Sequence, residues 1–202
     1  MVTEKLYEKT YKIINKKHHL NTNNDDILTL FIDSSNIYNK NGIEQIGYGQ
    51  NPKKQESKIS LICDKDKNIH SIILVHSINK TDNKKTLPND ATTIIPNLEN
   101  LLETKFNYKA INLVGDKGYA STLEMKEHTK NKYKVNIVYP HRQNQKVKTS
   151  EEHKILLKDR YVIENVFAKL KIYNRITVRK DKKECTYVGF LYLASMLIFK
   201  KK

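Results

Sequence analysis

The 202-residue chain has few cysteines, no long apolar run and no glycine-rich phosphate loop. Its two cysteines, Cys63 and Cys185, are far apart and form no Cys-x-x-Cys or Cys/His pattern, which argues against a disulfide framework or a zinc site. The N-terminus lacks the apolar segment of a secretory signal, and the longest apolar stretch, 188–199, is too short to cross a bilayer. We therefore expect a cytoplasmic protein without a membrane partner, in which 188–199 forms a core helix.

Acidic residues are also scarce relative to basic ones. The chain has 37 Lys and Arg against 22 Asp and Glu, a net charge of +15 and a pI near 9.6. Such a balance favours a polyanion, nucleic acid first, as the partner. Codon bias is the competing explanation, because the chain is also rich in Asn and Ile. The few arginines all lie in the C-terminal third, where a planar, two-pronged donor would grip phosphates or carboxylates: Arg142, Arg160, Arg175 and Arg179.

Apolar periodicity predicts one α/β domain with a mixed sheet of about five strands flanked by helices. A polar, glycine-bearing surface loop is expected over 34–58. Strands are predicted at 27–33, 58–64, 68–77, 110–116 and 135–140, and helices at 3–19, 92–102, 121–130, 150–173 and after residue 186.

Two of the buried-type strands end in an acid, Asp33 in FIDSS and Asp116 in VGDKGY. The carboxyl ends of strands are where ligand sites form in open α/β sheets, so these two side chains can be neighbours. Gly115 and Gly118 would let the backbone approach a ligand, although a plain tight turn explains them equally well.

The predicted helix at 150–173 supplies a third acid. At about 100° per residue, Arg160, Glu164 and Lys171 share one stripe at the border of an apolar arc. A catalytic carboxylate belongs at such a border, but a surface ion pair between Arg160 and Glu164 is the simpler alternative. The arc consists of Val162, Ile163, Val166, Phe167 and Leu170.

Together these motifs make the chain resemble insertion-sequence transposases with an RNase H-like DDE domain, from about Leu28 to Phe199. That group is marked by Tyr-x-x-Arg-x-x-x-Glu with a Lys seven positions after the Glu. RYVIENVFAKLK is similar to its glutamate helix, FIDSS and LVGDKGY to its two aspartate motifs, and NPKKQESKISLICDKDKNI to its basic segment and hairpin. Leu157 stands where the signature has Tyr, which puts in doubt the expected support around the glutamate.

The resemblance implies metal-dependent DNA cleavage and strand transfer by Asp33, Asp116 and Glu164. Asp33 would bridge two Mg²⁺ ions, for which Mn²⁺ can substitute, and the other two acids would each complete one site. DNA is the implied partner, bound by a homodimer. The candidates for phosphate contacts are Lys58, Lys117, Arg142, Arg160 and Lys171.

We expect residues 1–27 to be an N-terminal helix and linker, and 28–202 to be the catalytic domain. The N-terminal part is too short for a helix-turn-helix domain, so two expectations stand equally: one product of a split or truncated gene, whose other product reads the element's ends, or a decaying fragment. Three alternatives stay open: an inactive DNA-binding remnant, a nuclease of the same fold that does not join ends, and a metabolic α/β enzyme. The missing glycine-rich phosphate loop argues against the last.

Overall fold

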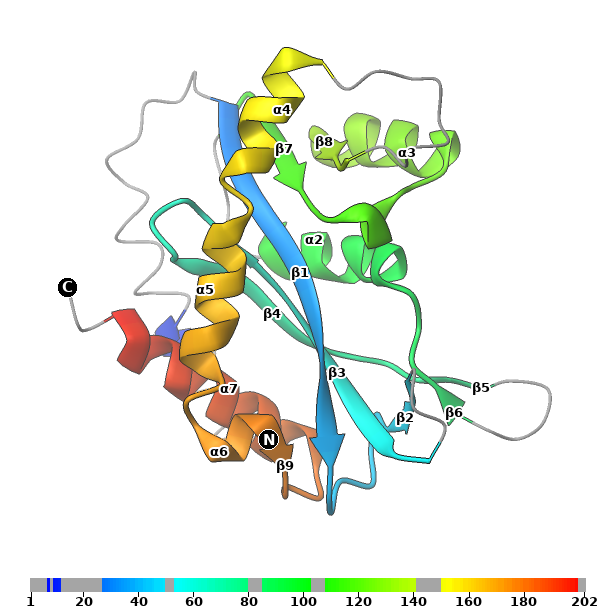
Figure 1. The fold of residues 1–202 in the computed structure, drawn as a ribbon, viewed down its shortest axis with the longest axis vertical. Coiled ribbons are helices and arrows are strands. Elements are labelled where there is room, and N and C mark those ends of the chain that lie inside the picture. Colours follow the sequence, from blue (N-terminus) through cyan, green and yellow to red (C-terminus); the bar gives the residue numbers. More distant parts are fainter. Residues whose placement is uncertain are drawn as a thin grey trace.

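The computed structural model describes residues 7, 9–11, 27–49, 53–79, 85–102, 108–140 and 150–199. They form a mixed sheet in the order β5-β6-β2-β3-β1-β7-β8, with β4 also paired to β3 and β9 to β1 (Figure 1). The longer strands are β1 (Ile27–Asn39), β3 (Gln55–Cys63), β4 (Ile69–Val75), β7 (Ala110–Val114) and β8 (Val135–Val138). Two-residue strands add β2 (Gly47–Tyr48), β5 (Ile78–Asn79), β6 (Lys85–Thr86) and β9 (Val178–Arg179).

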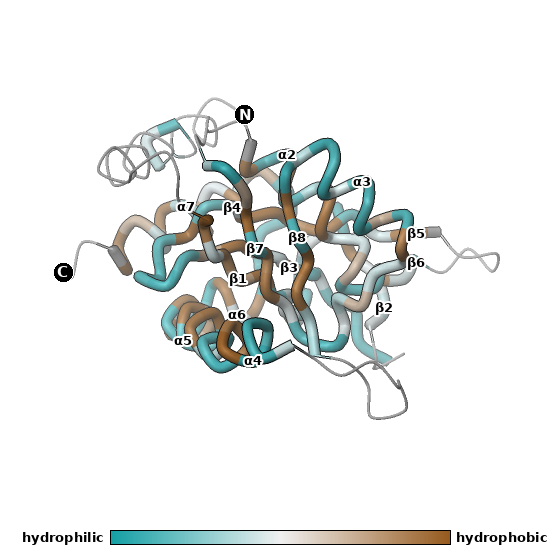
Figure 2. The backbone as a smooth tube through the Cα atoms, turned by 90° about the horizontal axis from the view of Figure 1, so that it is seen from above, coloured by the Kyte–Doolittle hydropathy of each residue, from teal (hydrophilic) through white to brown (hydrophobic). Residues whose placement is uncertain are grey.

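Helices cover both faces of this sheet. Strand residues therefore contribute to two apolar cores, one on each face. Figure 2 shows α2 and α3 on one side of the strands and α4, α5 and α6 on the other. The α-helices are α2 (Ile94–Leu102), α3 (Leu123–Tyr133), α4 (Glu151–Lys158), α5 (Tyr161–Leu170), α6 (Asn174–Thr177) and α7 (Glu184–Phe199). Two 3-10 turns, η1 (Asp90–Thr93) and η2 (Lys117–Tyr119), precede α2 and α3.

The five predicted strands are confirmed as the five longer strands. β3 and β4 are the predicted hairpin, and β7 and β8 run parallel to β1. The predicted core helix at the C-terminus is α7, which buries Tyr187, Leu191 and Ala194. No helix among the described residues is long and apolar enough to span a membrane.

Strand β1 is longer than predicted. It continues six residues past Asp33, through a segment predicted to be a loop, and pairs with β3 as far as Tyr38 and Glu56. Ile37 and Asn39 are buried, whereas Asn36 and Tyr38 are exposed, so this segment alternates as a strand should. The polar run Ser34–Asn36 hides that alternation in the sequence.

The prediction of one continuous helix at 150–173 was wrong. This segment is divided into α4 and α5, with Asp159 and Arg160 between them. At this junction the amides of Asp159 and Arg160 donate to carbonyls three residues earlier, as in a 3-10 turn. Of the predicted helix at 3–19, only Tyr7 and Lys9–Tyr11 are described, and these residues are helical.

Candidate active site

Asp33 and Asp116 lie at the same level of two adjacent parallel strands. β1 pairs with β7 up to Phe31 opposite Val114, and both aspartates follow two residues later. The negative charge of Asp116 reaches Asp33 and raises its pKa, so the two side chains are near each other. Strand β1 continues past Asp33, but β7 ends at Val114. The carboxyl-terminal strand end expected next to the aspartates is therefore present at β7 and absent at β1.

The strand residues two positions before the two aspartates belong to the face of the sheet that α5 covers. Phe31 and Val114 are part of the core formed with α5 and α7, and alternation along β1 places Asp33 on the same side as Phe31. Asp116 follows the end of β7 and begins the η2 turn. The α5 helix packs against β1, alongside which it runs in Figure 1. Asp33 therefore faces the side of the sheet on which α5, the helix of Glu164, packs.

The pKa of Asp33 depends on its burial and on the charged residues near it. The pKa of Asp33 is raised to about 6, mainly because the carboxyl group is buried. The negative charges of Asp116 and Asp90 raise it further. The Ser34 amide, which donates to Asp33 Oδ1 at 2.8 Å, and the positive charge of Arg160 lower it. Asp33 is thus a desolvated carboxyl surrounded by other acids, with one arginine in range.

Asp116 is held by the turn that follows it. It is the N-cap of η2, and its Oδ1 accepts a hydrogen bond from the Gly118 amide at 2.7 Å. An ideal Cβ on Gly115 would come within 2.7 Å of the buried ring of Tyr119. The hydroxyl of Tyr119 lies 2.7 Å from Oγ of Ser34, the residue that follows Asp33. The two glycines therefore permit close packing around Asp116.

Glu164, on α5, is paired with Arg160 and not with either aspartate. Its Oε1 lies 2.6 Å from Arg160 Nη2, and 53% of its side chain is exposed. The buried arc predicted for this helix is confirmed residue by residue, so Glu164 and Arg160 do border the core. In the described ranges, no three Asp, Glu, His or Cys side chains are close enough to hold a metal ion.

The five predicted phosphate contacts are placed differently from one another. Lys117 is exposed next to Asp116, and Lys171 is exposed at the end of α5. Arg160 is the residue paired with Glu164. Lys58 is buried, only 7% exposed, and its Nζ lies 2.6 Å from Asp90 Oδ1. Arg142 lies outside the described residues.

Two arginines that the sequence associated with phosphate or carboxylate binding hold the fold together, and Arg175 does so through a carboxylate. Arg179 is fully buried. It donates to Ser57 Oγ and to the backbone oxygens of Glu44, Asp181 and Lys182. Arg175 forms an ion pair with Asp181. Both guanidinium groups are already occupied by protein acceptors.

Asp90 is an acid of this region that the sequence prediction missed. Its Oδ2 and Asp116 Oδ1 would lie 2.8 Å and 2.9 Å from an ideal Cβ on Gly118. In the sequence, LPNDATTI looks like an ordinary helix start, where acids are common, so Asp90 carries no signal of its own. Its proximity to Asp33 and Asp116 follows only from the tertiary structure.

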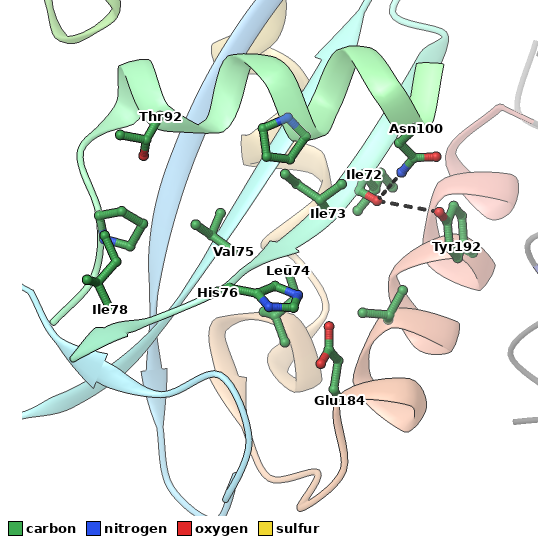
Figure 3. Close-up of a pocket in the computed structure, with 13 residues that line it drawn as sticks. Ile72, Ile73, Leu74, Val75, His76, Ile78, Thr92, Asn100, Glu184 and Tyr192 are labelled. Atoms are coloured by element: carbon green, nitrogen blue, oxygen red, sulfur yellow. Dashed lines mark hydrogen bonds between the residues drawn. The ribbon is translucent and has the colours of Figure 1, made fainter. Parts of the chain in front are cut away.

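A large cavity elsewhere borders none of these acids. It has a volume of about 450 Å³ and lies between β4, α2 and α7 (Figure 3). Asn100 Nδ2 and the Tyr192 hydroxyl both donate to the Ile72 carbonyl at its wall. Apolar side chains such as Leu74 and Val188 line much of it, so this cavity provides no carboxylate pair for chemistry.

A solved structure of similar fold is the cryo-EM structure of piggyBac transposase in a synaptic complex with hairpin DNA. The similarity has a TM-score of 0.52 at 12% sequence identity and covers 86% of this chain and 47% of that one. The present chain thus spans about half the length of that transposase. The similarity confirms the expected mixed α/β fold. A search of curated proteins finds no match to this sequence.

A family model, described as the transposase DDE domain, matches residues 24–198. This range contains Asp33, Asp116 and Glu164, together with every described strand and nearly all of α7. Because the match extends over most of the sequence, the chain belongs to the transposase DDE domain family.

Proposed function

We propose that this chain is the catalytic domain of a transposase that cuts DNA at the ends of a mobile element and joins those ends to target DNA. The observation that carries the proposal is the nearness of Asp33 and Asp116, each two residues beyond the last β1–β7 pair, within a chain of the transposase DDE family. Residues 28–202 would form this domain.

The side chains fit a hard divalent cation. Asp33, Asp116 and Glu164 offer only carboxylate oxygens, which are the donors that Mg²⁺ prefers. Two such ions would supply electrostatic stabilisation of the attacking and leaving oxygens during phosphodiester cleavage. We assign Asp33 to both ions and one ion each to Asp116 and Glu164, with Mn²⁺ as a substitute.

Asp33 shows why a cation is expected at this site. Its carboxyl is buried beside other acids, and its raised pKa measures how unfavourable its negative charge is there. A cation between Asp33 and Asp116 would remove that repulsion. A bound cation would therefore stabilise these neighbouring carboxylates.

Glu164 must change partner to complete this site. Its bond to Arg160 joins two partly exposed side chains, and such pairs contribute only about 0.3–0.5 kcal/mol. Rotation of Glu164 toward Asp33 therefore costs little. We propose that Arg160 then turns to a DNA phosphate, so that DNA binding and completion of the metal site accompany each other.

Lys117, Lys171 and Arg142 are proposed as further phosphate contacts, supported by the net charge of +15. Lys58 is better suited to a role inside the site, because its ammonium group is already bound by protein oxygens. A homodimer on DNA and a separate end-reading product remain part of this proposal.

A second candidate is an inactive DNA-binding remnant, which the Arg160–Glu164 pair and the Leu157 substitution favour. A nicking and strand-transfer assay with Mn²⁺ and any end-reading partner separates the possibilities. The transposase proposal expects wild type to cut and join, and Asp33→Asn, Asp116→Asn and Glu164→Gln each to lose orders of magnitude of activity. Cutting without joining indicates a nuclease, and no cutting indicates the remnant.

A further inference from the structure

Lys58 and Asp90 form an ion pair that is unusually buried for a lysine. Lys58 Nζ lies 2.6 Å from Asp90 Oδ1 and donates to the Pro88 carbonyl at 2.8 Å. The lysine side chain is 8% exposed and the aspartate side chain 34%. Burying an ammonium group costs free energy that a single ion pair rarely returns, and an apolar residue would usually fill such a position more favourably. The pair therefore suggests a use other than stability.

The geometry of Asp90 indicates what that use is. While Oδ1 binds Lys58, Oδ2 is turned to Gly118, on which an ideal Cβ would meet Asp90 Oδ2 at 2.8 Å and Asp116 Oδ1 at 2.9 Å. The two carboxylate oxygens thus flank the same position, no farther apart than these two distances together. The negative charge of Asp90 also reaches Asp33.

Buried hydrogen bonds fix Asp90 relative to the catalytic strand. Ser60 Oγ lies 3.2 Å from the Asp33 carbonyl and 3.1 Å from Thr93 Oγ1, which in turn donates to the Asp90 carbonyl at 2.7 Å. Asn97, fully buried on α2, donates to Ser60 Oγ at 2.8 Å. The turn that carries Asp90 is therefore coupled through Ser60 to the backbone of Asp33 itself.

We propose that Asp90, held by the Thr93–Ser60 hydrogen bonds and paired with Lys58, is a positioning residue of the active site that supports a divalent cation held by Asp33 and Asp116. This inference rests on the proposed function. Mg²⁺ and Mn²⁺ keep several of their waters when bound by proteins, and those waters need acceptors. Asp90 Oδ2 supplies one beside Asp116, together with a negative charge. In this proposal, Lys58 is the charge partner of Asp90 and not a phosphate contact.

The test measures Mn²⁺ affinity at pH 7.5 by electron paramagnetic resonance of the free ion, with circular dichroism as the check of folding. Asp90→Asn keeps shape but removes the charge, and its affinity should fall roughly 10-fold to 100-fold, as for other outer-shell partners. Lys58→Met leaves the Asp90 charge uncompensated, so its affinity should equal or exceed that of wild type. The double variant should bind as weakly as Asp90→Asn.

Glu127→Gln, at an exposed position of α3, is the matched control and should leave affinity unchanged. If Asp90 is only the counterion of Lys58, the double variant will bind Mn²⁺ like wild type, and the inference is overturned. The double variant gives this answer even if Asp90→Asn alone fails to fold. Asp33→Asn separates the two levels: if it also binds Mn²⁺ like wild type, the proposed metal site itself fails.

Discussion

Arg160 Nη2 lies 2.6 Å from Glu164 Oε1, one helical turn along α5, and the charge of Arg160 also reaches Asp33. Arg160→Gln breaks this pair without emptying a core position. We expect the free energy of unfolding to change by less than about 0.5 kcal/mol, because both side chains of the pair are partly exposed. Chemical denaturation measures this change.

The same variant should weaken DNA binding, because Arg160 is proposed to contact a phosphate. The slope of log affinity against log salt should become shallower by about 0.9 for the lost contact. Lys130→Gln, exposed on α3, is the control and should leave the slope unchanged. An unchanged slope for Arg160→Gln would remove Arg160 from the DNA interface.

Asp33→Asn should stabilise the protein at neutral pH. The folded-state pKa of Asp33, about 6, is above its ordinary value of 3.8, so folding disfavours the charged form. This cost is absent below pH 4, grows between pH 4 and 6, and is complete above about pH 6. The substitution removes it and should add up to about 3 kcal/mol above pH 6.

Urea unfolding of wild type and Asp33→Asn without metal, at pH 4 and pH 7.5, measures this difference. The two proteins should be nearly equal in stability at pH 4 and clearly different at pH 7.5. A loss of stability at pH 7.5 would mean that the Asp33 charge is favourably bound within the fold, against the proposed role.

Gly118→Ala should damage the site while preserving the fold. The new methyl group would fall within 2.9 Å of carboxylate oxygens of both Asp90 and Asp116, and at least one of them must move. Gly118 is exposed, so the core should stay intact. We expect Mn²⁺ affinity to fall about 10-fold or more, with an unchanged circular dichroism spectrum. Unchanged Mn²⁺ affinity would show that the two carboxylates do not act together.

The chain alone should bind DNA weakly, with little sequence preference and steep salt dependence. Its net charge of +15 supplies a phosphate contribution, while the motifs of the sequence supply no base-reading element. Fluorescence anisotropy with unrelated duplexes at several salt concentrations tests this expectation. Tight binding to one duplex at physiological salt would reveal a recognition element within this chain.

The sequence predicted the sheet and the two aspartates because their signals are local. Each longer strand contains a short segment rich in apolar residues, and Asp33 and Asp116 stand where two of these segments meet polar sequence. The buried arc of α5 follows from helical periodicity alone. These features need no knowledge of which element lies beside which.

The features that the sequence missed depend on tertiary pairing. The strand Ser34–Asn39 is polar in part, and its identity follows from its register with β3. Lys58 looked like a DNA contact because nothing local shows that it is buried against Asp90. Arg179 looked like a phosphate ligand because its carbonyl partners lie in two separate segments.

The central claim is that Asp33, Asp116 and Glu164 together hold two divalent ions on DNA. The most direct measurement is a crystal structure of the protein with Mn²⁺ and a cleaved duplex, in which anomalous scattering locates the metal. We expect two peaks about 4 Å apart on the α5 face, with Asp33 on both and Glu164 released from Arg160. Two ions bound elsewhere, or none beside Asp33 while Glu164 stays paired with Arg160, would contradict the account.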